Sequence, residues 1–365
     1  MTNFKIVFCA VCLPIKMSWG LTYCIEWFKM VSIEPKEMIF MKTLNKILTG
    51  VGVTAAAIAA ASPFIVGEVM WHGVLTKKGS DKLSKIFGEE PVEPSVKPQF
   101  DIKDGAGEWF ESTPHEDVTT LNSIGDTPAA VIFRNGDSHK WAIVCHGYTA
   151  EPCVMARYAR EYYKKGYNLV MPYMRGCEKG VKSPKGVVAY TMGYLDRLDL
   201  VAWVNYVVEL DPEAQIVLHG ESMGAATVMM AVGEPLPDNV KCAVEDCGFT
   251  SVWDEFAHNI VDMFHLPVFP YLYASQFCIK RHIDLDFKKA SSIEALKKSK
   301  TPMLFIHGEA DTFVPFEMVY KNYEAFGGEK DILTIPEADH AVSVDTDPVT
   351  YFNKVWEFVG KYIEE

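Results

Sequence analysis

The sequence predicts an α/β fold with a mostly parallel, doubly wound sheet of about eight strands and a helical cap. Short apolar runs alternate with segments of helical pattern through most of the chain, which is typical of a parallel sheet covered by helices. Two hairpin-like strands precede this alternation. Residues 246–302 interrupt it without a clear strand and are rich in aromatic side chains, so we expect an inserted helical cap there.

The composition favours a folded enzyme over a nucleic-acid-binding protein. Of the 365 residues, 49% are hydrophobic, which allows a large core. The formal net charge of -13 argues against a nucleic-acid partner. The nine cysteines are scattered; Cys9 and Cys12 form a single CxxC, but no second such pair or suitably spaced histidines complete a metal site, so we expect no disulfide framework, no metal and no cofactor.

The N-terminal part is expected to lie outside the enzyme domain. Residues 1–40 show no sustained period and precede Met41, a second plausible start, so we expect a non-native or disordered extension. Residues 41–75 contain an uncharged run at 47–67, long enough at about 20 residues to span a bilayer. The run also resembles a cleavable signal, and a buried helix is the third alternative. We therefore expect membrane contact through 47–67 and a membrane-anchored or exported protein, although lysines at both ends leave the side of the membrane open.

A linker and leading helix are predicted at 76–115, including a proline-rich connector, and the enzyme domain at 116–365. Within that domain, strands are expected at 117–122, 129–133, 141–145, 168–171, 216–218, 240–245, 303–306 and 332–335. Helices are expected at 155–165, 194–209, 222–232, 316–325 and 348–363.

The cap is expected at 251–300 and would set substrate choice. Most of its aromatic side chains would pack the cap onto the core. We expect Phe264 and Phe269 to contact an apolar part of the substrate.

The motif Gly220-Glu221-Ser222-Met223-Gly224 lies between an apolar run that predicts a strand and a small, apolar run that predicts a helix. Gly-x-Ser-x-Gly in a strand–turn–helix is typical of a nucleophile elbow. Free N–H groups at the helix N-terminus would point at an anion formed on the serine. We therefore expect Ser222 to be a nucleophile. The alternative is a chance glycine- and serine-containing loop.

A serine nucleophile needs a histidine base and usually a carboxylate that orients the histidine. Asp311 and His340 each follow a predicted strand, and the order Ser, Asp, His fits the strand–turn–helix elbow. Asp339, Glu337 and Glu309 are competing carboxylates. We disfavour Asp339 because its side chain would have to double back to reach the adjacent ring.

The anion also needs hydrogen-bond donors. The predicted strand 141–145 ends at His146-Gly147-Tyr148, where the chain turns before the next helix. We expect the backbone N–H groups of Tyr148 and Met223 to form the oxyanion hole. His146 is expected to order the loop and not to transfer protons.

These motifs together resemble the serine α/β-hydrolase family, in its bacterial esterase-like branch. The resemblance covers roughly 116–362 and rests on His-Gly-Tyr-Thr at 146–149, the elbow motif, His307-Gly308-x-x-Asp311 with Val314-Pro315, and His340. It implies an α/β-hydrolase fold and an acyl-enzyme, in which Ser222 attacks, His340 shuttles the proton and Asp311 orients His340. Close members often carry an N-terminal hydrophobic segment, which is consistent with residues 47–67.

Two features depart from that family's pattern. Residues 173–178 read Tyr-Met-Arg-Gly-Cys-Glu where many relatives have Asp-x-Arg-Gly-His-Gly. Asp339-His340-Ala341 replaces the frequent Gly-His-Gly. Both changes leave the three expected catalytic residues in place but alter the loops beside them.

The sequence therefore predicts a serine hydrolase that cleaves a small-molecule carboxylic ester. An amidase or peptidase would use the same three residues and is the main alternative. A non-catalytic binding module on a hydrolase scaffold is less favoured, because none of the three residues is missing.

Overall fold

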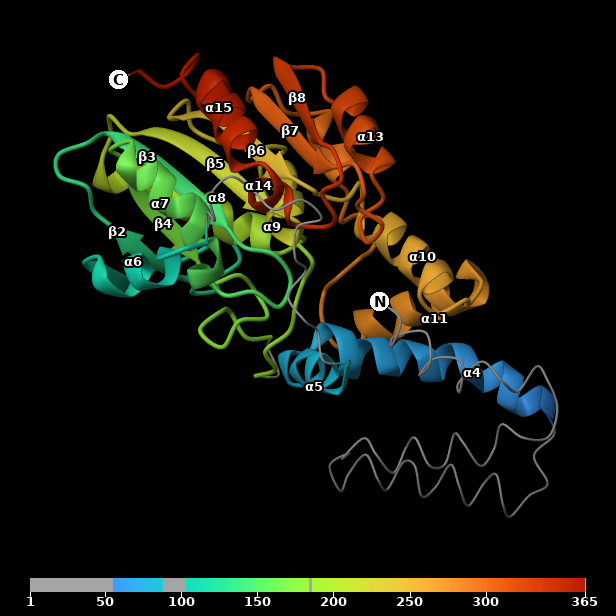
Figure 1. Ribbon diagram of the computed structural model, residues 1–365. Helices are drawn as coiled ribbons and strands as arrows, with labels where there is room; N and C mark the ends of the chain where they lie inside the picture. The colour runs from blue at the N-terminus through green and yellow to red at the C-terminus, as the bar shows by residue number, and fades with distance from the viewer. Residues whose placement is uncertain (1–54, 88–102, 184–185, 365) are drawn as a thin grey trace. The chain divides into compact units, whose positions relative to one another are not determined.

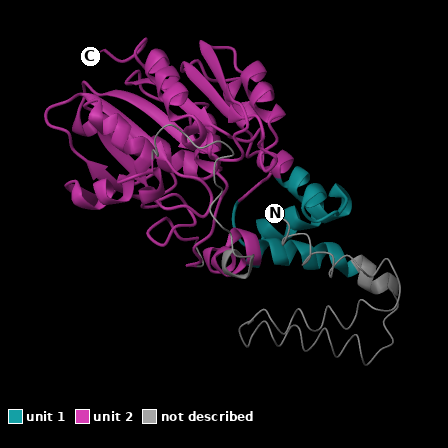
Figure 2. Cartoon of the chain, in the orientation of Figure 1, with its two compact units in different colours: residues 1–72, 256–284 teal, residues 73–255, 285–365 magenta. Residues whose placement is uncertain are grey.

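The computed structural model describes residues 55–87, 103–183 and 186–364, which fall into two compact units (Figure 2). Unit 1 contains residues 1–72 and 256–284. Unit 2 contains residues 73–255 and 285–365. The predicted extension at 1–40 and the proline-rich connector at 89–98 lie outside the described residues.

Unit 2 is built on one eight-stranded sheet in the order β1-β2-β4-β3-β5-β6-β7-β8 (Figure 1). Pairs β1–β2 and β2–β4 are antiparallel, and all other neighbours are parallel. The strands are β1 (His115–Thr119), β2 (Ala129–Phe133), β3 (Lys140–Cys145), β4 (Asn168–Pro172), β5 (Gln215–Glu221), β6 (Val240–Asp246), β7 (Met303–Gly308) and β8 (Lys330–Ile335). The predicted α/β-hydrolase fold, with its mostly parallel sheet, is confirmed.

Helices cover both faces of this sheet, as Figure 1 shows. One face is covered by α6 (Ala106–Ser112), α7 (Ala156–Lys164) and α15 (Pro348–Val359), with the short α14 (Ser343–Thr346) before the last helix. The other carries the row α8 (Asp196–Leu210), α9 (Met223–Ala231), α12 (Ser292–Leu296) and α13 (Glu317–Ala325). Because successive strand residues face opposite sides, the apolar strands of the sheet supply side chains to both layers.

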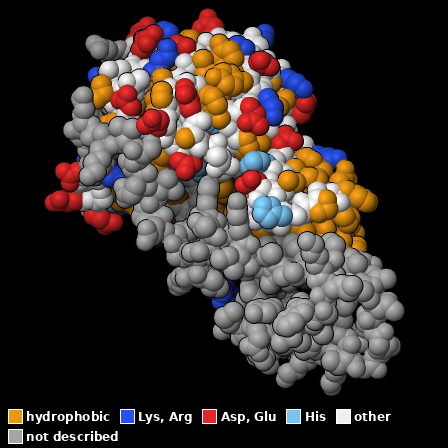
Figure 3. All heavy atoms as spheres, turned by 45° about the vertical axis from the view of Figure 1, so that its right-hand side comes forward, with side chains coloured by type: hydrophobic (Ala, Val, Ile, Leu, Met, Phe, Trp, Pro, Cys, Tyr) orange, Lys and Arg blue, Asp and Glu red, His pale blue; other side chains and the backbone are white. Residues whose placement is uncertain are grey.

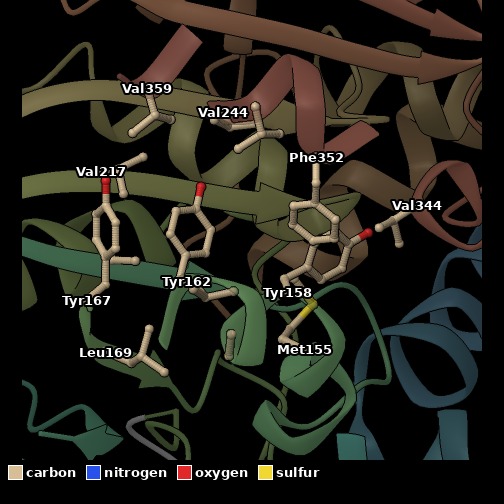
Figure 4. Packing of buried hydrophobic residues seen from close by; sticks show 14 of the residues in the cluster. Met155, Tyr158, Tyr162, Tyr167, Leu169, Val217, Val244, Val344, Phe352 and Val359 are labelled. Carbon is tan, nitrogen blue, oxygen red and sulfur yellow. The ribbon is translucent and has the colours of Figure 1, made fainter. Parts of the chain in front are cut away.

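The main core lies between the sheet and α7 and α15. Figure 4 shows Tyr158 and Tyr162 of α7 packing toward valines of the strands, with Phe352 of α15 beside them. These side chains are almost completely buried, and Tyr158 and Tyr162 are 0% exposed. The apolar side chains of the strands, α7 and α15 therefore form one continuous core on this face of the sheet.

The predicted strand boundaries differ most at β1. The sequence predicted a strand at 117–122, whereas β1 runs from His115 to Thr119. The reason is the side chain of Asn122, whose Oδ1 accepts the backbone N–H groups of Ile124 (3.0 Å) and Asp126 (2.8 Å). This local hydrogen bonding favours a turn over strand pairing.

Unit 1 contains one helix from the N-terminal region and part of the inserted segment, whereas α12 of that segment belongs to unit 2. Residues 251–300 are fully described and contain helices but no named strand, in agreement with the expected helical character of the cap. Among the described residues, the α-helices of unit 1 are α4 (Ala55–Val69), most of α10 (Val252–Asp262) and α11 (Val268–Lys280). Helix α11 and most of α10 therefore share a compact unit with residues that the sequence assigned to a signal or anchor.

Helices α4 and α11 pack closely in unit 1. Ser62 Oγ lies 3.0 Å from the hydroxyl oxygen of Tyr271. A Cβ atom placed on Gly67 would lie 2.9 Å from Cys278 Sγ, so the missing side chain lets the two helices approach. The small residues of α4 thus form a helix–helix contact.

The predicted membrane-anchored or exported location is wrong, whereas membrane contact through 47–67 stays a prediction. Residues 47–54 lie outside the described part of the chain. Helix α4, which holds the rest, has 15 residues and contains Pro63, whereas a span needs about 20 apolar residues. Within the ranges that the structure describes, no helix is both long and apolar enough to cross a membrane.

The net negative charge does not form one continuous acidic patch on the face seen in Figure 3. Acidic and basic side chains lie interspersed there. Among the described residues several acidic and basic side chains pair, such as Lys354 with Asp331 (2.6 Å). Exposed ion pairs of this kind contribute little to stability, about 0–1 kcal/mol each.

Candidate active site

Ser222 lies at the sharp turn where β5 leads directly into α9 (Figure 1). Its backbone has φ 54° and ψ -115°, a conformation that side-chain-bearing residues rarely adopt. Its N–H donates to the carbonyl oxygen of Asp246 on β6 (2.8 Å), which anchors the turn to the sheet. A strained serine between strand and helix is the geometry of a nucleophile elbow.

The two glycines of the motif make this turn possible. A Cβ on Gly220 would lie 2.3 Å from the carbonyl oxygen of Gly224. A Cβ on Gly224 would lie 2.1 Å from the carbonyl oxygen of Cys145 at the end of β3. Strand, turn and helix therefore touch backbone to backbone, and any side chain at either position would force them apart.

Ser222, His340 and Asp311 meet at the carboxyl edge of the sheet. Ser222 Oγ lies 2.9 Å from His340 Nε2, and His340 Nδ1 lies 2.7 Å from Asp311 Oδ2. Because the carboxylate can only accept, Nδ1 carries the ring proton and donates it to Asp311. Nε2 is then free to accept the hydroxyl hydrogen of Ser222, which is the arrangement a general base needs.

The charges of this group are consistent with a histidine base held by an ionised aspartate. Burial alone would raise the pKa of Asp311, but the imidazoles of His340 and His307 outweigh it and lower the pKa to about 2. Burial alone would lower the pKa of His340, but the charge and hydrogen bond of Asp311 outweigh it and raise the pKa above its ordinary value. The aspartate is therefore charged at neutral pH and stabilises the imidazolium form of the ring.

Of the competing carboxylates, Asp339 contacts the backbone of the histidine and not its ring. Asp339 Oδ1 accepts the N–H of His340 at 2.7 Å. Glu309 Oε1 accepts a hydrogen bond from Thr334 Oγ1 at 2.7 Å. Asp311 is the carboxylate that the fold brings to Nδ1 of His340.

The expected oxyanion donors flank Ser222. Met223 is the first residue of α9, where a backbone N–H has no acceptor within the helix. The loop after β3 approaches from the other side, because a Cβ on Gly147 would lie 3.9 Å from Ser222 Oγ. Tyr148 follows directly in that loop, and its hydroxyl donates to the carbonyl oxygen of Val74.

His146 holds this loop through both ring nitrogens. The N–H of Met174 donates to His146 Nε2 at 3.2 Å, so Nδ1 carries the proton and donates to the carbonyl oxygen of Gly147 at 2.8 Å. Burial lowers the pKa of His146 to about 4, which keeps the ring neutral at pH 7. The expectation that His146 orders the loop agrees with these contacts.

His307 contacts the expected triad, although no role was predicted for it from the sequence. Its Nε2 lies 3.1 Å from Asp311 Oδ2 and 3.0 Å from the carbonyl oxygen of Val314. The other carboxylate oxygen of Asp311 accepts the N–H groups of Phe313 (3.0 Å) and Val314 (2.9 Å). Asp311 is therefore fixed on all sides. The signal in the sequence that could have indicated this contact is the four-residue spacing between Asp311 and His307 near the end of β7.

Cys247 lies beside Asp311 and His340. One potential ligand atom from each of the three residues lies within 4.8 Å of the other two, the kind of separation that a metal ion requires. His340 Nδ1 already makes the 2.7 Å hydrogen bond to Asp311. Cys247 is buried, and burial raises the pKa of its thiol well above the ordinary value. The atoms present therefore form an acid–base pair with a neutral thiol beside it.

Phe264 and Phe269 lie in unit 1. Phe269 stands at the start of α11 and is 72% exposed, whereas Phe264 is half-buried. Their contact with a substrate stays a prediction.

Comparison with known proteins places the chain in a family. The sequence profile of the prolyl oligopeptidase family matches residues 155–365, more than half of the chain, including Ser222, Asp311 and His340. The chain belongs to the prolyl oligopeptidase family. It is therefore a serine hydrolase of the α/β-hydrolase superfamily, which confirms the resemblance at that level.

Among relatives, the uncharacterized protein YqkD of Bacillus subtilis (strain 168) is 25% identical over 323 residues, covering 87% of this chain and 97% of YqkD. The uncharacterized protein YfhR of Escherichia coli O157:H7 is 24% identical over 264 residues, covering 70% of this chain and 76% of YfhR.

Solved structures similar to this prolyl oligopeptidase family member include an esterase and a peptidase. The Pyrococcus furiosus esterase Pf2001 has a TM-score of 0.56 at 23% identity, with 74% of this chain and 99% of the esterase covered. The Pyrococcus horikoshii acylaminoacyl peptidase has a TM-score of 0.50 at 18% identity, with 71% of this chain and 44% of the peptidase covered. At these identities the likeness shows the shared fold.

Proposed function

We propose that this serine hydrolase cleaves carboxylic esters through an acyl-enzyme on Ser222, with His340 as general base and acid and Asp311 as the residue that orients it. The observation that carries the proposal is the continuous hydrogen-bonded line from Ser222 Oγ to His340 Nε2 (2.9 Å) and from Nδ1 to Asp311 (2.7 Å). A binding module on the same scaffold would have no need for this alignment.

In the proposed reaction Ser222 Oγ attacks the ester carbonyl carbon while its proton moves to His340 Nε2. The resulting imidazolium protonates the leaving alcohol oxygen as the carbon–oxygen bond breaks, which leaves the acyl group on Ser222. Water then attacks the acyl carbon and gives one proton to His340. Release of the acid returns that proton to Ser222 Oγ and regenerates the free enzyme.

The tetrahedral intermediates of both steps carry a negative oxygen, which the N–H groups of Met223 and Tyr148 would stabilise. This assignment of the two donors is supported by the position of Met223 at the N-terminus of α9 and by the close approach of Gly147 to Ser222. Each such donor stabilises a transition state by about 3–4 kcal/mol. Esters are the less demanding substrates, because an alcohol leaves a tetrahedral intermediate more readily than an amine.

Peptide or amide hydrolysis is the second candidate, and the match to the prolyl oligopeptidase family favours it. The same serine, histidine and oxyanion donors serve both reactions, so the leaving group decides between them. The test is a series of p-nitrophenyl esters of increasing acyl length beside p-nitroanilides and short peptidyl anilides with the same acyl groups. For each acyl group, we expect the ratio of kcat/KM for the ester to kcat/KM for the matched anilide to be above one. This ratio should also exceed the same ratio measured side by side for a peptidase of the prolyl oligopeptidase family. A peptidyl anilide that is cleaved faster than every ester would contradict the ester proposal.

The reaction should slow as the pH falls, because only the unprotonated His340 can accept the serine proton. Asp311 raises the pKa of His340 above the ordinary imidazole value, so kcat/KM should rise through an apparent pKa above about 6.5 and then level off. Initial rates with one ester between pH 5 and 9 measure this. A profile that is flat across the range, or that rises through a pKa well below 6 (about one unit under the ordinary value), contradicts a histidine base paired with Asp311.

A further inference from the structure

The buried guanidinium of Arg157 hydrogen-bonds to the residue before Ser222 and to the residue after His340. Arg157 belongs to α7 and is 6% exposed. One terminal nitrogen donates to the carboxylate of Glu221, the residue before Ser222, and also to the carbonyl oxygen of Ala341 at 3.1 Å. Ala341 is the residue after His340.

The other terminal nitrogen extends the contact along the same loop. It donates to Asp345 Oδ2 in α14 at 2.9 Å. Lys103 lies 3.1 Å from the same carboxylate oxygen, so Asp345 keeps a cationic partner of its own. Arg157 therefore joins three elements: α7, the elbow after β5, and the loop from His340 to α14.

We propose that Arg157 is a positioning residue that clamps the His340 loop to the nucleophile elbow and thereby sets the distance between Ser222 Oγ and His340 Nε2. The proposal rests on the proposed serine-hydrolase function of that site. Arg157 itself does not touch the reacting atoms. It acts through the two residues that flank them.

The His340 loop has a physical need for such a clamp. Ala341 has φ 57° and Glu337 has φ 59°, so non-glycine residues on both sides of His340 hold a backbone conformation that side chains disfavour. Strained backbone of this kind persists only where its surroundings hold it in place. The Arg157 hydrogen bond to the Ala341 carbonyl group is one such support.

Glu221 gives the clamp its rigidity on the elbow side. Its Oε2 accepts a hydrogen bond from the hydroxyl of Tyr158 at 2.6 Å in addition to the one from Arg157. Both donors are consecutive residues of α7, which packs on the main core. The elbow is thus tied to a rigid helix, and the same helix holds the histidine loop. A planar guanidinium can bridge several acceptors at once, whereas an ammonium group acts as a compact point charge.

The first test replaces Arg157 by lysine, which keeps the charge but cannot reach the three acceptors together. We expect kcat for an ester to fall by about 10- to 100-fold, the scale expected for a displacement of about 1 Å between reacting groups. KM should stay within about twofold, because the clamp does not contact substrate. The rate constant for labelling of Ser222 by a small fluorophosphonate should fall by a similar factor. Arg197→Lys is the matched control, since Arg197 also pairs with a glutamate (Glu234, 2.8 Å) but on helix α8, and it should leave both rates unchanged.

A second variant separates positioning from simple neutralisation of a buried charge. The double substitution Arg157→Met with Glu221→Leu removes both charges, so neither is left buried without a partner. It also removes the hydrogen bond to Ala341. If Arg157 positions the loop, the double variant remains at least 10-fold slow in kcat and in labelling. Recovery of the wild-type rates would show that Arg157 only neutralises Glu221.

The proposal is overturned if Arg157→Lys keeps kcat and labelling within twofold, if only KM changes, or if the double variant recovers. Should Arg157→Lys fail to fold by circular dichroism, the double variant decides alone. A wild-type protein that neither reacts with the fluorophosphonate nor cleaves any ester or anilide would instead count against the proposed function. The two failures are therefore distinct.

Discussion

Replacing Ser222 by alanine should lower kcat for the best ester by about 10⁴–10⁶-fold, because the covalent route disappears with Oγ. The fold should be unaffected, since among the described residues the hydroxyl hydrogen-bonds to His340 and the backbone conformation that alanine must adopt is already imposed on serine. What remains would be the background rate due to the oxyanion donors and substrate binding.

The comparison variant is Ser138→Ala, in the loop before β3, where the hydroxyl accepts only a local N–H from Lys140. It should keep the wild-type kcat within twofold. Rates with a p-nitrophenyl ester, beside melting curves of both variants, measure the effect. More than a few per cent of activity left in Ser222→Ala would contradict its role.

Replacing Asp311 by asparagine should be the second-largest effect, a loss in kcat of about 10⁴-fold. The amide cannot carry the charge that stabilises the imidazolium, and its NH₂ group favours the wrong tautomer of His340. The pKa of His340 should fall as well, because Asp311 is the main group that raises it. The pH profile of the variant should therefore move to lower pH.

Asp339→Asn is the matched control, since it makes the same chemical change one residue before the ring. An asparagine oxygen can still accept the backbone N–H of His340 that Asp339 accepts now at 2.7 Å. We expect a loss below about 10-fold, the scale of one neutral hydrogen bond. A larger loss from Asp339→Asn than from Asp311→Asn would reverse the assignment of the carboxylate.

The parts of this site that follow from local chain geometry could be predicted from the sequence. Ser222 sits in a motif whose glycines are required by contacts within a few residues, such as that between Gly220 and Gly224. Asp311 and His340 could be placed because each follows a strand of a parallel sheet, and the carboxyl ends of such strands share one edge. Local pattern and strand order thus carry most of the information for this group.

Contacts between distant parts of the chain left no comparable signal. Arg157 reaches Glu221, 64 positions away, and Ala341, 184 positions away. No spacing or periodicity marks a single buried arginine in an amphipathic helix. Such a residue becomes visible only when the helix, the elbow and the histidine loop are seen together.

The N-terminal segment was misread because one composition suits two environments. An uncharged, alanine-rich run is typical of a membrane span, but small residues also let helices pack closely within a protein. In α4, Gly67 fits against Cys278 and Ser275 of α11. In the described part of the chain, α4 has 15 residues and contains Pro63, and no helix there is long and apolar enough to cross a membrane.

The most direct test of the account is the site at which a fluorophosphonate probe adds. The wild-type protein should gain one probe mass, and peptide mass spectrometry should place it on Ser222, because that hydroxyl faces the base His340 at 2.9 Å. Ser222→Ala should gain none, and denatured wild-type protein should not react. A stoichiometric adduct on any other residue, or labelling that persists in Ser222→Ala, would contradict the proposed nucleophile.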